Sequence, residues 1–334
     1  PIPWTPLVLS EQLGLRPQLP IAMTKIIALW NRYLLINVEG DALPLPAHIT
    51  YIHFPLFALG ENKLHHLALY YGENLQLKSK IISMLRTRLL YNPALNLSYK
   101  ILVNSKFTAN ILGSINKKAK VNVLYPPLRS PFKDYIKNNL NNSNLLKNRK
   151  KYVITISGFH TKKKLTDVLL IAKEIKHAKF IIIGALWDLN YYKKLRNTIQ
   201  TLSLKNVILL PNLEKKKLCK LLLKSKIYLH TARFEHFGIS IVEAMASGLV
   251  PVVHKSGGPW EDILDKKQGL YGYAYSNIYE TVSYIENLLT DENLRFRLAK
   301  MAIKRSLMFS EEKFSERFQA IVKSLERQLP KSLG

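Results

Sequence analysis

Two glutamates, Glu235 and Glu243, flank the start of an apolar segment in the run EHFGISIVEAMASG. Gly238 lies where a helix would begin, and the free N–H groups and dipole of a helix start favour an anion such as a phosphate. Carboxylates also accept hydrogen bonds from vicinal hydroxyls, as they do in ribose recognition. The alternative is a capped helix with a solvent-facing glutamate, but a bare charge on so apolar a helix is unusual. The pattern therefore predicts a site for a phosphorylated ligand that carries sugar hydroxyls.

Two further loops have side chains that suit the same ligand. In SGFHTKKK, the small residues around Gly158 allow a close approach to the backbone, and Lys162 to Lys164 offer charge for a diphosphate. In KSGGP, the adjacent Gly257 and Gly258 form a tight turn that a ligand can approach. Each loop alone has a plain alternative, a solvated lysine run or a simple turn. Three such loops in one domain favour a single binding site.

The elements that must position these loops alternate between strands and helices. Short β-rich runs are separated by segments with apolar residues at helical spacing, which favours a parallel, doubly wound sheet. In such sheets ligands bind outside the carboxyl ends of the strands, where the three loops begin. The expected strands cover 151–156, 180–183, 206–210, 227–230 and 250–254, and the expected helices lie near 165–172, 189–202, 213–224 and 239–246.

The first half of the chain has a similar but less regular pattern. Strands are expected at 33–38, 49–53, 99–104 and 121–124, and a helical stretch with scattered Lys and Arg at 63–92. The polar run NNLNNSNLLKNRK at 138–150 is typical of a linker. We therefore expect two Rossmann-like domains, at 1–145 and 146–310, followed by a C-terminal helix at 311–334.

Composition narrows the classes of protein. The chain has 334 residues, 47% of them apolar, which is enough for about two globular domains. A single cysteine, Cys219, excludes an intramolecular disulfide framework and any multi-cysteine zinc site. No apolar run reaches the ~18–20 residues of a membrane span, and we expect no signal peptide. These features favour a cytoplasmic protein.

The formal net charge of +27 attracts polyanions. An anionic membrane surface and phosphorylated substrates both fit, as does the plain alternative of a lysine-rich proteome. Basic residues among Leu and Ile at 63–92 are typical of a segment that docks on anionic lipid. An ordinary amphipathic helix pair would have the same pattern. Nucleic acid is not an expected partner, because the sequence lacks aromatic–basic interleaving and any recognised module.

The run EHFGISIVEAMASGLVPVVHKSGGP resembles the donor site of GT-B glycosyltransferases of family 4, the glycosyl transferases group 1. The E-H-F-G and S-G-G-P variants are most similar to mannosyltransferases that extend dolichol-linked oligosaccharides and to their archaeal relatives. Three first-half motifs resemble the same subgroup: YIHFP at 51–55, VNSKFTA at 103–109 and VLYPP at 123–127. The resemblance extends from about Leu35 to Phe309.

The resemblance implies a GT-B fold, with two Rossmann-like domains facing a cleft. It implies that Glu243 binds the ribose hydroxyls, that Glu235 contacts the transferred sugar, and that Lys163 neutralises the departing diphosphate. The backbone at Phe237 and Gly238 would hold the sugar and diphosphate. His53 would face the donor sugar from the first domain; without the resemblance, a core histidine beside Pro55 is the better interpretation. The full expected set is His53, Glu235 and Lys163 as catalytic residues, and Gly158, Lys163, Glu235, Phe237, Gly238, Glu243, Gly257 and Gly258 at the donor.

The implied activity is a retaining transfer of a sugar, with mannose the expected one, from a GDP- or UDP-sugar to a glycan or lipid-linked glycan. No metal and no cofactor are expected. Two departures from the family pattern support an alternative, a degenerate non-catalytic partner subunit. Gly158 stands where the family usually has an arginine, and the first domain lacks the usual opening strand and glycine-rich loop. We therefore expect an N-terminally truncated or diverged first domain. The implied location is the cytoplasmic membrane face.

Overall fold

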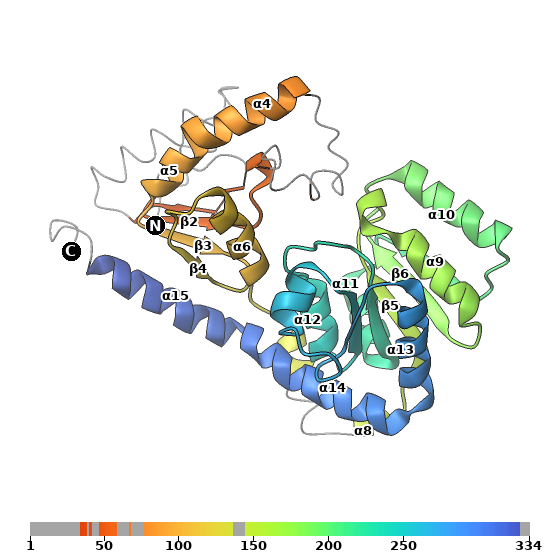
Figure 1. The fold of residues 1–334 in the computed structure, drawn as a ribbon. Coiled ribbons are helices and arrows are strands. Elements are labelled where there is room, and N and C mark those ends of the chain that lie inside the picture. Colours follow the sequence, from red (N-terminus) through yellow and green to blue (C-terminus); the bar gives the residue numbers. More distant parts are fainter. Residues whose placement is uncertain are drawn as a thin grey trace. The chain divides into compact units, whose positions relative to one another are not determined.

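Two parallel β-sheets organise the chain in the computed structural model, which describes residues 34–38, 40, 41, 47–58, 67, 77–135 and 144–327. The chain divides into two compact units, Pro1–Tyr125 with Ser315–Gly334, and Pro126–Phe314. Both units combine a parallel sheet with helices, as the α/β prediction required (Figure 1). The chain passes from one unit to the other after Tyr125 and again before Ser315, whereas the predicted domain boundaries lie at 145 and 310. Residues 136–143 of the predicted linker lie outside the described residues.

The first unit contains a four-stranded sheet in the order β1-β2-β3-β4. Its strands are β1 (Ile36–Asn37), β2 (Ile49–Ile52), β3 (Lys100–Val103) and β4 (Val121–Val123), at the predicted positions. The predicted helical stretch at 63–92 is confirmed from residue 77, while most of 63–76 lies outside the described residues. The helices are η1 (Leu56–Ala58), α4 (Leu77–Arg86), the π-helical η3 (Thr87–Tyr91), α5 (Asn92–Asn96) and α6 (Lys106–Ile115).

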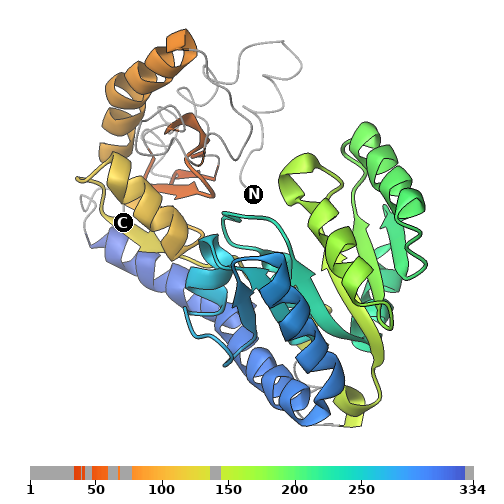
Figure 2. The ribbon, with the colours of Figure 1, turned by 45° about the vertical axis from the view of Figure 1, so that its right-hand side comes forward.

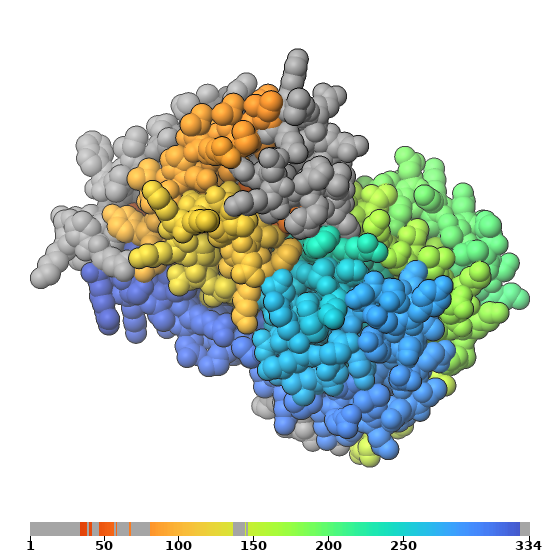
Figure 3. Space-filling view, viewed as in Figure 1, coloured from red at the N-terminus to blue at the C-terminus, as the bar shows by residue number. Residues whose placement is uncertain are grey.

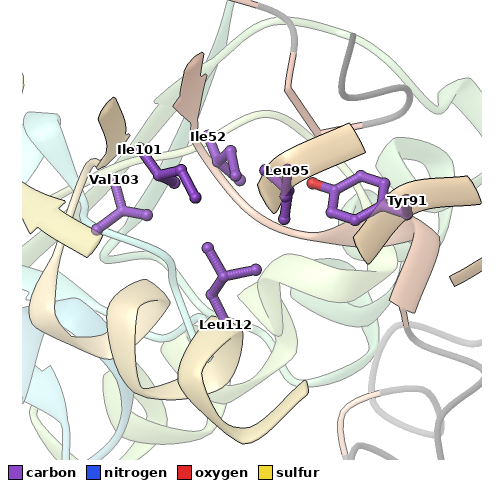
Figure 4. Close-up of a cluster of buried hydrophobic side chains, with 6 residues drawn as sticks. All are labelled: Ile52, Tyr91, Leu95, Ile101, Val103 and Leu112. Atoms are coloured by element: carbon purple, nitrogen blue, oxygen red, sulfur yellow. The ribbon is translucent and has the colours of Figure 1, made fainter. Parts of the chain in front are cut away.

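A small apolar core holds this unit together. Side chains from β2, β3, η3, α5 and α6 meet in one cluster and are almost completely buried (Figure 4). The α6 helix enters the cluster in a fixed register because the Ser105 side chain caps it, accepting a hydrogen bond from the Thr108 N–H at 3.0 Å. The cluster consists of Ile52, Tyr91, Leu95, Ile101, Val103 and Leu112.

The second unit contains a six-stranded sheet in the order β10-β9-β8-β5-β6-β7. The five predicted strands are all present and a sixth, β10, was not predicted. Successive strands extend the sheet in one direction from β5 to β7 and in the other from β8 to β10, so the topological switch lies between β5 and β8. The strands are β5 (Lys150–Ile156), β6 (Lys179–Gly184), β7 (Val207–Pro211), β8 (Ser225–His230), β9 (Val250–His254) and β10 (Tyr273–Tyr275).

Helices cover both faces of this sheet. On one face lie α9 (Leu165–Glu174) and α13 (Ile278–Thr290), with α10 (Leu189–Thr201) beside α9 (Figures 1 and 2). On the other face lie α11 (Lys215–Lys224), α12 (Ile239–Ala246) and α14 (Glu292–Ser306). In the space-filling view, the helices coloured green and blue form much of the visible surface of this unit (Figure 3).

Short helices and one long helix complete the chain. The short ones are α8 (Asn144–Lys147), η4 (Thr161–Lys163), the π-helical η5 (Pro259–Ile263) and η6 (Leu307–Phe309). The predicted C-terminal helix is α15 (Glu311–Glu326). Among the residues that the structure describes, no helix is both long enough and apolar enough to cross a membrane.

Candidate active site

The loops that follow β5 and β8 are held side by side at the topological switch. The Tyr228 hydroxyl on β8 donates to the Ile156 carbonyl at the end of β5 (3.1 Å) and lies 2.8 Å from the Ser240 hydroxyl in the first turn of α12. The Thr231 hydroxyl donates to the Lys163 carbonyl at 2.8 Å. These bonds fix the start of α12 against the lysine-containing loop. Ligands of open α/β sheets bind at this position.

Lys163 and Glu235 form an ion pair between the two loops. Lys163 Nζ lies 2.7 Å from Glu235 Oε2, and the two side chains are 27% and 19% exposed. Burial alone would raise the pKa of Glu235, but His230, Lys163 and His236 outweigh it and hold that pKa well below its usual range. Glu235 is therefore a persistent carboxylate. The two predicted catalytic residues of this unit thus lie in contact.

Glu243 has the opposite electrostatic setting. It lies on α12 between fully buried apolar neighbours, and its carboxylate accepts no hydrogen bond from any residue that the structure describes. Burial raises the pKa of Glu243 to about 7, against a lowering effect of Lys215. A ligand that donates hydrogen bonds to this carboxyl group would stabilise its ionised form, which burial disfavours.

The start of α12 requires glycine. Gly238 caps the helix with φ = 95°, in the left-handed region, where a Cβ would also lie 2.7 Å from Ile241 Cδ1. The preceding Phe237 is buried against Phe309, with ring centroids 5.4 Å apart. The backbone at these two predicted donor-binding positions is therefore held firmly beside Glu235.

The two glycines of KSGGP allow this loop to pack against the backbone around Glu235. Gly257 has φ = 67°, and a Cβ there would lie 2.4 Å from the Glu235 carbonyl oxygen. A Cβ at Gly258 would lie 2.3 Å from the His236 carbonyl oxygen, and the Gly258 N–H donates to the Glu235 carbonyl at 2.9 Å. Ser256 Oγ adds a bond from the Phe234 N–H at 2.9 Å. These glycines thus brace Glu235, and their predicted contact with the donor stays a prediction.

Gly158 packs against an aromatic ring from the next strand loop. A Cβ at Gly158 would lie 2.5–2.9 Å from the six-membered ring of Trp187, which follows β6. Trp187 is 67% exposed. The indole therefore covers the side of Gly158 from which an arginine side chain would project.

His53 belongs to the other unit. It follows β2, its side chain is exposed, and its ring packs edge-on against Tyr51 with centroids 4.9 Å apart. Its backbone is fixed because Asp41 Oδ1 accepts from the N–H groups of His53 (2.6 Å) and Phe54 (3.0 Å). The exposed side chain excludes the interpretation of a core histidine.

Three residues of the site escaped the sequence analysis. His230 is buried at the end of β8, with Nε2 3.6 Å from Glu235 Oε2, and Trp187 and Ser256 make the contacts described above. A polar residue at the carboxyl end of a buried strand was the available signal for His230. Trp187 and Ser256 had no comparable signal. Within the described residues, no cluster of three or more His, Cys, Asp or Glu side chains could hold a metal ion.

The sequence of this chain matches a known protein family. The model of "Glycosyl transferases group 1" matches residues 136–305. Two relatives are named GDP-Man:Man(3)GlcNAc(2)-PP-Dol alpha-1,2-mannosyltransferase. The one from Dictyostelium discoideum is 28% identical over 68% of this chain and 48% of its own length, and the one from Mus musculus is 27% identical over 83% and 60%. The chain thus spans about half to three fifths of these relatives.

Solved structures of similar fold include Anabaena HepE in complex with UDP and glucose, with a TM-score of 0.64 and 18% identity, over 92% of this chain and 76% of that one. The sucrose-phosphate synthase of Thermosynechococcus elongatus has a TM-score of 0.65 and 14% identity, over 84% and 68%. At these identities the likeness concerns the fold, which is GT-B as predicted.

Proposed function

The chain belongs to the glycosyl transferases group 1, and from this premise we propose that it transfers a sugar from a nucleotide-sugar donor bound at the carboxyl edge of the six-stranded sheet. The observation that supports this most directly is the arrangement at the topological switch. There the Lys163–Glu235 ion pair and the half-buried Glu243 surround the start of α12.

The proposed roles follow from the chemistry of each group. The carboxylate of Glu243 accepts hydrogen bonds from the ribose hydroxyls, and the N–H groups at the start of α12 hold the diphosphate. Lys163 neutralises the charge that develops on the diphosphate as it leaves, and Glu235 contacts the transferred sugar. His53 is the proposed acceptor-side histidine. The reaction is proposed to retain the anomeric configuration and to need no metal or cofactor.

We propose mannose as the sugar, GDP as the nucleotide and a lipid-linked glycan as the acceptor. The support is that relatives aligned over most of this chain bear the name of an enzyme with that donor and acceptor. The proposed place of action is the cytoplasmic face of a membrane.

An amphipathic surface on the first unit supports binding to an anionic membrane. On α4 and η3 the side chains of Ile82, Leu89 and Leu90 are 56%, 67% and 63% exposed, with Arg86 and Arg88 beside them. Exposed apolar side chains next to cations suit an anionic lipid surface. We expect the protein to sediment with phosphatidylserine vesicles but not with phosphatidylcholine vesicles, and Leu89→Ser/Leu90→Ser to weaken sedimentation. Equal sedimentation with both lipids would contradict this proposal.

The deciding experiment for the donor is calorimetric titration with GDP, UDP and their sugars, followed by a donor-hydrolysis screen over a nucleotide-sugar panel. We expect binding of GDP and release of mannose from GDP-mannose. Binding without any turnover, even with lipid-linked acceptors, would favour the alternative of a non-catalytic partner subunit, for which Gly158 in place of the family's arginine is the motivation. Absence of any nucleotide binding would refute the donor site itself.

A further inference from the structure

His230 is a buried histidine whose ring has no hydrogen bond. It is the last residue of β8, its side chain is 4% exposed, and neither ring nitrogen has a hydrogen-bond partner. Buried polar groups in folded proteins are nearly always hydrogen-bonded, so an exception calls for a reason. The position of His230, at the topological switch beside the proposed donor site, supplies one.

The ring is held with one edge toward Glu235. The backbone carbonyl of His230 accepts a hydrogen bond from the Tyr275 hydroxyl at 3.1 Å. The imidazole plane lies at 15° to the Tyr228 ring, with centroids 6.3 Å apart. Nε2 lies 3.6 Å from Glu235 Oε2, too far for a hydrogen bond but within a small movement of one. The same oxygen accepts from Lys163 Nζ at 2.7 Å.

Both contacts fall on one oxygen of the carboxylate. Oε2 faces Lys163 and His230, while Oε1 has no hydrogen-bond partner among the residues that the structure describes. Two donors on Oε2 would fix the rotation of the carboxylate and leave Oε1 for a ligand. The titratable and charged groups around this ring and the carboxylate are Lys163, Tyr228, Arg233, Glu235, His236, His254 and Tyr275.

We propose that His230 is a positioning residue for sugar transfer, which donates its Nε2–H to Glu235 Oε2 when the donor binds and so directs Oε1 at the transferred sugar. This inference rests on the proposed function. Because the contact aligns a group for the reaction more than it binds the nucleotide, its loss should lower kcat and leave KM for the donor almost unchanged.

The kinetic test compares an aromatic and an amide replacement. His230→Phe keeps a ring beside Tyr228 but has no N–H, whereas His230→Gln keeps an N–H donor near the position of Nε2. We expect His230→Phe to lower kcat for donor hydrolysis roughly 10- to 100-fold, with KM within about twofold of the wild-type value. His230→Gln should keep most of the wild-type kcat. The control is His177→Phe, because His177 lies on the surface in an ion pair with Glu286 at 3.4 Å and should leave kcat unchanged.

A second measurement does not depend on turnover. The carboxyl ¹³C signal of Glu235, followed by NMR as pH is lowered, reports whether His230 acts on this carboxylate. We expect the pKa of Glu235 to rise in His230→Phe and to stay low in His230→Gln. If His230→Phe fails to fold, His230→Leu takes its place in both measurements.

Two outcomes would overturn the proposal. One is an unchanged kcat and an unchanged Glu235 titration in His230→Phe. The other is a His230→Gln variant as inactive as His230→Phe, with a matching fall in melting temperature, which would show that the ring serves packing alone. Failure of the wild-type protein to bind or hydrolyse any nucleotide sugar would instead refute the proposed function, and the NMR titration would still decide whether His230 acts on Glu235.

Discussion

Replacing Glu243 by glutamine should stabilise the protein and weaken its proposed donor binding at the same time. In the folded chain the pKa of this carboxyl is raised to about 7 by burial, against an ordinary value of 4.5. The folded state therefore holds a proton that the unfolded chain releases between these two values. Stability must then fall as pH rises from about 4.5 to 7, and it levels off above pH 7.

The size of the effect follows from the two pKa values. Their difference corresponds to at most about 3 kcal/mol of folding free energy at pH 8. Glu243→Gln keeps the shape of the side chain but cannot ionise, so it should recover much of this free energy at pH 8 and almost none near pH 4.5. For a domain of this size we expect a melting temperature higher by about 2–4 °C per kcal/mol.

Donor binding should change in the opposite direction. Ribose hydroxyls that donate to Glu243 favour its ionised form, so wild-type affinity for GDP should fall up to about tenfold for each pH unit below 7. Glu243→Gln should bind at least about tenfold more weakly at pH 8, since a hydrogen bond to a charged group contributes about 1.5–3 kcal/mol. Its affinity should not depend on pH through this group.

The assays are scanning calorimetry and isothermal titration with GDP between pH 5.5 and 8.5. Glu174→Gln is the control, because Glu174 is an exposed glutamate on α9 and its replacement should change stability by no more than about 0.5 kcal/mol. A Glu243→Gln variant that is less stable than wild type at pH 8, or that binds GDP as tightly, would refute the reasoning.

Two further predictions concern the glycines. Gly257→Ala should lower the free energy of unfolding by more than about 2 kcal/mol and abolish GDP binding, because φ = 67° and a Cβ 2.4 Å from a carbonyl oxygen both oppose the substitution. The control is Gly113→Ala on α6, where a Cβ would meet nothing within 4 Å and should stabilise the first unit slightly. An equal change of stability in both variants would contradict this prediction. Gly158→Ala should displace the Trp187 ring and shift the tryptophan fluorescence, whereas adding Trp187→Ala should remove the strain. Additive effects of the two changes on melting temperature would argue against that contact.

Much of the fold was predictable because its strands are short runs of β-branched and apolar residues. The strand KYVITI and the strand VPVVH carry this signal clearly and became β5 and β9. β10 has only three residues at the edge of the sheet, with the sequence Tyr-Ala-Tyr, and too short a run to be distinguished from a loop.

The site was predictable at the level of loops and not of contacts. The rule that ligands bind at the carboxyl ends of strands placed Lys163 and Glu235 at one edge although they are far apart in sequence. Their direct pairing, and the packing of Gly257 on the Glu235 carbonyl, depend on backbone conformations such as φ = 50° at Phe234. Such conformations are set by tertiary packing, which local sequence does not encode.

The two glutamates that first marked this segment differ in what surrounds them, and the difference supports the separate roles proposed for them. Glu235 has Lys163 and His230 within 4 Å, and these neighbours hold its pKa well below its usual range. A permanent anion suits the sugar carbon, where positive charge develops as the bond to the diphosphate breaks. Glu243 has no ion-pair partner among the described residues, so burial raises its pKa to about 7, and hydroxyls that donate to it would favour its ionised form. Pairs of carboxyl groups whose pKa values are driven apart by their surroundings are typical of active sites. Because both residues are glutamates, the difference between their proposed roles must come from their surroundings.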